Sequence, residues 1–107
     1  MQKVDSVLND ATPLMFRLSQ NYPDPFMGKT RITYCVAYKT RVRLRVLNSA
    51  GEVVDTLVDE EKNPGTYGID FAARVGPSGK ERKLASGKYS YRLEAGDYLS
   101  EKTMTLL

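Results

Sequence analysis

The side chains that could perform covalent or metal chemistry are few in this sequence. Of its 107 residues one is a cysteine, Cys35, and none is a histidine. Without imidazole, Ser-His-Asp and Cys-His catalysis and any His-ligated zinc or iron site are excluded. A single cysteine also excludes an internal disulfide and a multi-cysteine metal site. Because no neighbouring residue type would activate the thiol, we interpret Cys35 as a buried or half-buried packing residue.

The acidic residues offer no better catalytic site. The densest group, Asp59-Glu60-Glu61, is contiguous, so its side chains diverge instead of converging on one ion or substrate. No loop with the alternating Asp spacing of a calcium site occurs. We therefore expect no catalytic residue, no cofactor and no metal, and we predict that the protein is not an enzyme.

A basic stripe is the most pronounced charge pattern. Residues 41–46 read RVRLRV, which puts Arg41, Arg43 and Arg45 on one face of a strand. Such a stripe could contact nucleic acid or anionic lipopolysaccharide; its alternative role is a solvated strand face that discourages edge pairing. No patterned aromatic platform accompanies it, so we expect no nucleic-acid binding and only a weak contact with lipopolysaccharide. The net charge of +3 is mild and interspersed, which favours solubility.

The elements that must position these residues are β-strands. From residue 14 onward apolar and polar residues alternate with period two, as in antiparallel sheets with one solvated face. The pattern predicts strands at 14–19, 32–38, 41–46, 53–58, 66–71, 88–95 and 98–106. Seven short strands with frequent turns and no helix predict an all-β fold, an immunoglobulin-like antiparallel β-sandwich of about seven strands. A small barrel is the alternative.

Turn residues separate the strands. Residues 48–51 suit a type I turn that ends with Gly51 in the left-handed region, and Gly96-Asp97 suits a two-residue hairpin with Gly96 at positive φ. Residues 63–65, Asn-Pro-Gly, suit a longer turn.

Two segments interrupt this pattern of strands. Residues 72–86 are longer than a hairpin needs, and we expect a mobile surface loop there. We expect residues 1–13 to be a polar linker or a disordered segment, and residues 14–107 to form one domain.

One segment, residues 18–26 with the sequence LSQNYPDPF, stands apart from the alternation. Its motif residues are Asn21, Tyr22, Pro23, Asp24, Pro25 and Phe26. Two roles are open for it, a recognition epitope and a stiff corner. In the corner reading, which we favour, the prolines fix φ and both aromatic rings pack on the sandwich. One of the two X-Pro bonds could be cis.

Residues 18–26 resemble the opening of the type A C-terminal sorting domain of the type IX (Por) secretion system. That family opens with Leu-x-Gln-Asn-Tyr-Pro-Asn-Pro-Phe and continues with an Ile-x-Tyr strand, which here is 32–34. The resemblance covers residues 14–107. Its further motif residues are Gly51, Gly87, Tyr89, Tyr91, Lys102, Met104 and Leu106. Asp24 replaces the usual second asparagine, and the loop at 72–86 is longer than in the family. The chain also resembles the immunoglobulin-like domains of flagellar hook-capping proteins.

The resemblance implies a non-catalytic domain that the outer-membrane translocon recognises. A sortase-like peptidase would cut within or before residues 1–13, and the cargo would be released or attached to surface lipopolysaccharide. The expected location is then outside the cell or on its surface, with this domain at the end of a larger precursor. The alternative is a free-standing immunoglobulin-like interaction or structural module of hook-cap or adhesion type. It would be cytoplasmic if Met1 is the natural start, since neither a signal peptide nor a membrane-spanning segment is visible.

Overall fold

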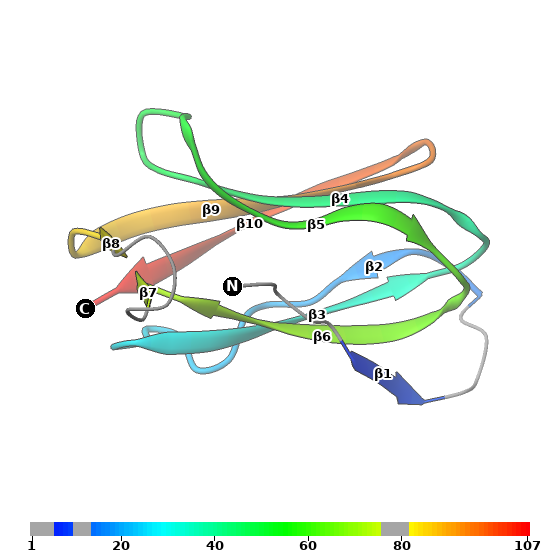
Figure 1. The fold of residues 1–107 in the computed structure, drawn as a ribbon, viewed down its shortest axis with the longest axis horizontal. Helices are drawn as coiled ribbons and strands as arrows, with labels where there is room; N and C mark the ends of the chain where they lie inside the picture. Colours follow the sequence, from blue (N-terminus) through cyan, green and yellow to red (C-terminus); the bar gives the residue numbers. More distant parts are fainter. Residues whose placement is uncertain (1–5, 10–13, 76–81) are drawn as a thin grey trace.

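The structure, a computed structural model, describes residues 6–9, 14–75 and 82–107 and contains ten strands and no helix in these ranges (Figure 1). The strands are β1 (Ser6–Asn9), β2 (Arg17–Leu18), β3 (Lys29–Val36), β4 (Thr40–Leu47), β5 (Val53–Lys62), β6 (Gly65–Ala72), β7 (Arg74–Val75), β8 (Arg82–Lys83), β9 (Gly87–Ala95) and β10 (Tyr98–Leu106).

Two antiparallel sheets pack face to face, as the two layers of Figure 1 show. One sheet has the order β1-β6-β3-β2 and the other the order β10-β9-β4-β5. The chain crosses from one sheet to the other between β3 and β4, between β5 and β6, and between β6 and β9. Apart from β1 and the separate pair β7-β8, seven strands build an immunoglobulin-like sandwich, which confirms the predicted fold class and excludes the small barrel.

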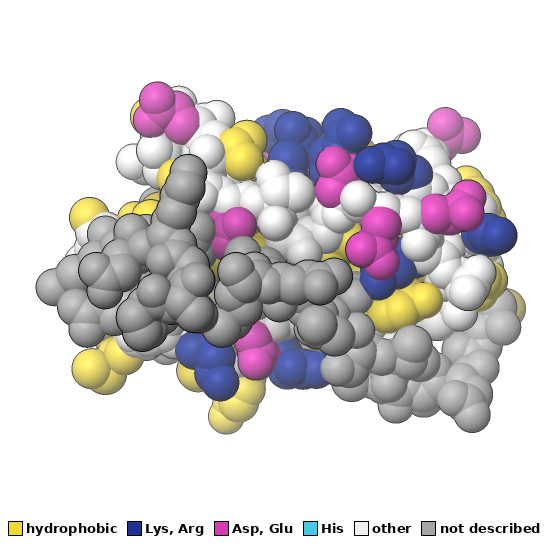
Figure 2. Space-filling model, in the orientation of Figure 1, with side chains coloured by type: hydrophobic (Ala, Val, Ile, Leu, Met, Phe, Trp, Pro, Cys, Tyr) yellow, Lys and Arg dark blue, Asp and Glu magenta, His cyan; other side chains and the backbone are white. Residues whose placement is uncertain are grey.

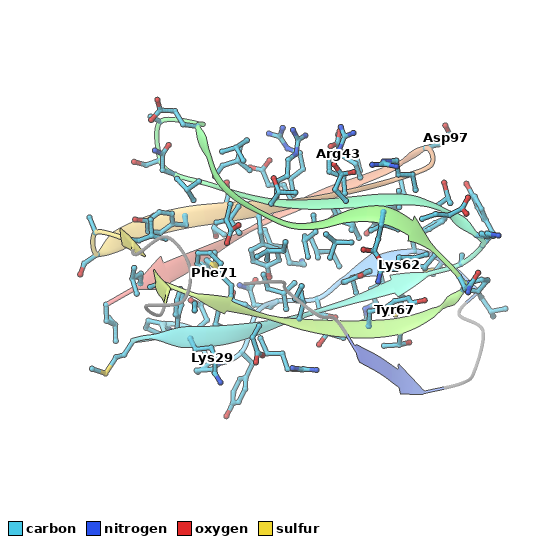
Figure 3. All side chains as sticks on the ribbon, in the orientation of Figure 1. Lys29, Arg43, Lys62, Tyr67, Phe71 and Asp97 are labelled. Carbon is cyan, nitrogen blue, oxygen red and sulfur yellow. The ribbon has the colours of Figure 1, made fainter. Side chains whose placement is uncertain are left out.

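The core lies between the sheets and follows the predicted alternation. On β3 the side chains of Ile32, Tyr34 and Val36 are fully buried, and Phe71 of β6 lies between the two layers in Figure 3. The remaining fully buried strand residues include Val42, Leu44, Val46, Tyr91 and Leu93. Burying an aliphatic or aromatic side chain of this size stabilises a fold by about 1.5–3 kcal/mol. The alternation therefore fixes the register, because a slip of one residue would bury the arginines of β4 instead.

Two turns match the predicted chemistry. Gly51 has φ of +83°, and its N–H donates to the Asn48 carbonyl at 3.0 Å. The Asn48 side-chain oxygen accepts from the N–H groups of Ala50 and Glu52. Gly96 has φ of +58°, and Ala95 pairs directly with Tyr98 across the two-residue hairpin. Residues 63–65 differ from a hairpin, because they carry the chain from β5 in one sheet to β6 in the other.

The first predicted strand is shorter than expected, and the second, predicted at 32–38, runs instead from Lys29 to Val36. β2 begins at Arg17, and Leu14 is 99% exposed, because β3 ends at Val36 and offers no partner to residues 14 and 15. For the same reason Tyr38 is half exposed and not in the core; its ring meets Phe16 edge-on with centroids 4.9 Å apart.

Strands also occur in two segments for which none was predicted. Within the predicted linker, β1 pairs antiparallel with β6, with Val7 opposite Tyr67. Within the predicted loop at 72–86, β7 and β8 form a two-stranded ribbon. Residues 1–5, 10–13 and 76–81 lie outside the described residues, and so does the mobility expected for the centre of that loop.

Candidate functional site

The opening motif and the last strand meet in one surface. The Phe26 N–H donates to the Thr105 carbonyl at 3.0 Å, and the Leu107 N–H donates to the Phe26 carbonyl at 2.9 Å. The Asp24 carboxylate accepts from the Thr105 N–H at 2.9 Å, and the Gln20 amide donates to the Thr103 carbonyl at 2.7 Å. Two segments about 80 positions apart in the chain thus form one motif surface, defined here as residues 20–28 and 102–107.

The two aromatic residues of the motif have opposite environments. Phe26 is 1% exposed, and its ring lies edge-on to Phe71 at 6.2 Å between centroids. Tyr22 is 81% exposed, so the expectation that both rings pack on the sandwich is wrong for Tyr22. The backbone of Tyr22 pairs with Arg31, and Asn21 before it points inward, so the alternation turns the Tyr22 ring outward. The peptide bonds before Pro23 and Pro25 are both cis.

A buried polar cluster beneath the motif fixes the shape of this turn. Asn21 is 2% exposed, and its amide donates to the Thr30 hydroxyl at 3.0 Å. Thr30, also 2% exposed, donates in turn to the Pro23 carbonyl at 2.8 Å. Because a buried polar group without a partner is costly, these bonds hold the turn to one arrangement.

Tyr91 joins the centre of β9 to this turn. Its hydroxyl donates to the Ser19 carbonyl at 2.7 Å and accepts from the Asn21 N–H at 2.7 Å. Burial raises the pKa of Tyr91 to about 12, against the opposing effect of the Asn21 N–H, and the charge of Asp24 raises it further. The hydroxyl is therefore protonated at neutral pH and serves as a fixed donor and acceptor.

The remaining motif residues lie in β9 and β10 and at the turn that contains Gly51. Met104 and Leu106 of the last strand are buried in the core, whereas Lys102 is half-buried. The Tyr89 hydroxyl donates to the Ala85 carbonyl at 2.7 Å, which is the tyrosine corner found in immunoglobulin-like domains. Gly87, with φ of +144°, lies at that corner, and a shallow hollow of about 260 Å³ separates the corner from the turn that contains Gly51.

The three arginines of the stripe are paired with two acidic neighbours. Arg41 and Arg43 both contact Asp59 of β5, at 2.9 and 3.6 Å, and Arg45 contacts Glu94 of β9 at 2.6 Å. Although desolvation opposes it, the hydrogen bond and charge of Arg41, with a contribution from Arg43, hold the pKa of Asp59 below its usual value. Figure 3 shows Arg43 on the outer face of its sheet, and Figure 2 shows acidic side chains interspersed with the basic ones. The stripe is therefore a paired, solvated strand face.

Cys35 is half-buried, as predicted, on the outer face of β3, with its sulfur 3.6 Å from the Thr66 hydroxyl oxygen. In the part of the chain that the structure describes, no three histidine, cysteine or acidic side chains gather around a point where a metal ion could sit. The same part of the chain contains no helix long and apolar enough to cross a membrane.

One hollow at the motif surface has no signal in the sequence. A shallow hollow of about 310 Å³ is lined mainly by apolar residues, among them Met27, Ala73, Leu84 and Leu107. Met27 and Leu107 are 78% and 63% exposed. Because the lining comes from separate segments of the chain, no local pattern could have predicted it.

Comparison of the chain with protein-family models, with curated proteins and with solved structures finds no match.

Proposed function

We propose that this domain is a non-catalytic C-terminal sorting signal that the type IX secretion machinery recognises for the export and surface attachment of a cargo protein. The observation that supports it is the pairing of Phe26 with Thr105 and Leu107. The resemblance to the family rests on residues 20–28 and 102–107, and these two segments form one surface. A machinery that reads both parts would find them together only in the folded domain.

The division between buried and exposed motif residues fits this role. Asn21, Phe26 and Met104 are buried and hold the turn and the strand in place. Tyr22 and Met27 project into solvent from the turn, where a partner can contact them. Both side chains are therefore available for contact with a protein partner.

The proposed partners are the outer-membrane translocon and a sortase-like peptidase acting on the amino-terminal side of the domain. A weak contact with anionic lipopolysaccharide is also part of the proposal. The arginine stripe supports it little, since Arg41, Arg43 and Arg45 are each paired with a carboxylate.

The test is a folded reporter fused ahead of residues 1–107 in a host that has the secretion system and in a matched host that lacks it. We expect the reporter on the surface or in the medium of the first host alone. Retention in both hosts contradicts the proposal and favours the second candidate, a free-standing immunoglobulin-like interaction module. The seven-stranded sandwich fits that candidate equally well.

A further inference from the structure

At the border of the motif surface, Tyr22 and Arg31 form a directly opposed pair. The Tyr22 N–H donates to the Arg31 carbonyl at 3.0 Å, and the Arg31 N–H donates to the Tyr22 carbonyl at 2.9 Å. In such an antiparallel pair both side chains lie on the same face of the sheet, with β-carbons about 5 Å apart. This face is the outer one, because Thr30 and Ile32 on either side of Arg31 are buried. The exposed Tyr22 ring and the Arg31 guanidinium are therefore neighbours on the surface.

The guanidinium group of Arg31 lies flat on β6. A β-carbon at position 68, which is Gly68, would lie 2.7, 2.8 and 2.9 Å from Nη2, Nε and Cζ of Arg31. Because these three distances are nearly equal, the plane of the guanidinium faces the glycine. Its Nη1 donates to the Asp70 carboxylate at 3.0 Å. These two contacts orient the group, although 41% of the side chain is exposed.

The glycine at position 68 is not required by the backbone of β6. Gly68 lies inside the strand, opposite Thr33 of β3, and is not among the glycines with positive φ. Glycine in the interior of a strand weakens it and often marks a place where another group approaches closely. Here the group that approaches is the Arg31 guanidinium. The glycine therefore lowers the stability of the strand and permits a preoriented arginine.

The charges on this face of the sheet are unbalanced. Lys29 and Arg31 both contact Asp70, at 3.8 and 3.0 Å, so two cations share one carboxylate. Figure 3 shows Lys29 on the side of β3 that faces away from the other sheet. Arg17 of β2 lies on the same face, opposite Cys35, and has no ion-pair partner among the described residues. The face therefore attracts an anionic group.

We infer that Arg31 and Tyr22 bind a carboxylate-bearing segment of a partner protein, and that Gly68 positions Arg31 for this contact. The Asp70 contact uses Nη1, which leaves the edge formed by Nη2 and Nε for a bidentate pair with a second carboxylate. The Tyr22 ring supplies apolar contact area beside it. Arginine and tyrosine are enriched among the residues that dominate the binding energy of protein interfaces. The partner is a component of the secretion machinery, so this inference rests on the proposed function and gives the chemistry of its recognition.

The test compares two glycine-to-alanine substitutions in β6, made in the reporter fusion with residues 1–107. Gly68→Ala displaces the Arg31 guanidinium without changing any charge. Gly65→Ala is the matched control, because its β-carbon would meet the Tyr67 ring at an ordinary 3.6 Å. We expect both variants to fold, since only the flexible end of Arg31 must move. Gly65→Ala should be exported like the wild type, and Gly68→Ala about tenfold less.

A second pair of variants removes the guanidinium itself. Arg31→Gln should reduce export about as much as Gly68→Ala. Arg92→Gln removes an exposed ion pair with Glu101 on the other sheet, at 2.9 Å, and should be exported like the wild type. Because Gly68 acts through Arg31, the double variant Gly68→Ala with Arg31→Gln should be exported no less than Arg31→Gln alone. This pair carries the comparison if Gly68→Ala does not fold.

Export of Arg31→Gln, or of folded Gly68→Ala, at the wild-type level overturns the inference and leaves the sorting role intact. An equal loss in Gly65→Ala or in Arg92→Gln also overturns it, since the loss would not depend on the Arg31 guanidinium. Retention of the wild-type fusion in both hosts overturns the proposed function, and the inference with it. Sedimentation with phosphatidylglycerol vesicles tests for a lipid partner instead. Vesicle binding by the wild type that Arg31→Gln abolishes would overturn the protein carboxylate as the ligand.

Discussion

The Asp24 carboxylate accepts a hydrogen bond from the Thr105 N–H at 2.9 Å and so ties the opening motif to the last strand. The same carboxylate lies 3.4 Å from the Gln20 amide, which in turn donates to Thr103. Because Thr105 also pairs with Phe26, one residue of β10 is bonded to two residues of the turn. The motif and the carboxyl-terminal strand therefore form a single structural unit.

Replacing Asp24 tests this link. Asp24→Ala removes the acceptor for the Thr105 N–H and should lower the free energy of unfolding by about 1 kcal/mol, since the site is exposed to water. Asp24→Asn keeps an oxygen acceptor and should lower the free energy of unfolding clearly less. Urea denaturation measures the free energy of unfolding of both variants. An equal decrease in the two would show that the hydrogen bond to Thr105 does not stabilise the domain.

Truncation of Phe26 and truncation of Tyr22 should change the stability of the domain by very different amounts. Phe26→Ala removes a buried ring and should destabilise the domain by about 3–5 kcal/mol. Tyr22→Ala removes a ring that is 81% exposed and should change stability by no more than about 0.5 kcal/mol. Thermal or urea unfolding of the pair is the measurement. Similar decreases in melting temperature for the two variants would contradict the conclusion that the buried Phe26 ring holds the turn on the sandwich.

Tyr91→Phe should alter both stability and its pH dependence. At neutral pH the variant leaves the Ser19 carbonyl and the Asn21 N–H without their partner, at a cost of about 1–3 kcal/mol. Tyr89→Phe, which loses one bond to the Ala85 carbonyl, is the matched control and should cost less.

The pKa of Tyr91 sets the alkaline window. Its folded-state pKa of about 12 lies above the unfolded value of about 10, so its stabilising contribution is complete below pH 10 and disappears as pH rises to about 12. Tyr91→Phe should therefore lose stability less steeply than the wild type across this range. Parallel curves of unfolding free energy against pH for the two proteins would contradict the raised pKa of Tyr91.

Asp59 should stabilise the folded domain at neutral pH and lose this contribution as pH falls, whereas Tyr91 loses its contribution as pH rises. Its folded-state pKa is lowered, so the contribution is present above the unfolded pKa of about 3.9 and is lost as pH falls through the folded value. The wild type should exceed Asp59→Asn in stability at neutral pH, and this small difference should shrink under acid conditions. A difference that grows as pH falls would show that Arg41 and Arg43 do not stabilise the carboxylate.

The strands and turns could be predicted because their causes are local. The alternation at 41–46 predicts which face of β4 is buried, and glycine at 51 and 96 predicts positive φ in two turns. The length of the first strand could not be predicted. It depends on where β3 ends, and the residues at 14–15 have the right pattern but no partner strand.

The candidate site could be predicted as two separate motifs but not as one surface. The pairing of Phe26 with Thr105 joins positions about 80 residues apart, and no periodicity encodes such a contact. The outward direction of Tyr22 was also missed, because it follows from the bridge between Tyr22 and Arg31 and from the inward direction of Asn21. An exposed ring and a buried one look alike in the sequence NYPDPF.

Export of a reporter carrying substitutions on the motif surface tests the central claim most directly. Tyr22→Ser with Met27→Ser changes two exposed side chains of that surface and should leave the melting temperature nearly unchanged. Met15→Ser with Val53→Ser changes two exposed apolar residues outside it and is the matched control. If the folded motif surface is recognised, the first variant should be retained in the cell and the control exported like the wild type. Export of both at the wild-type level would contradict the claim.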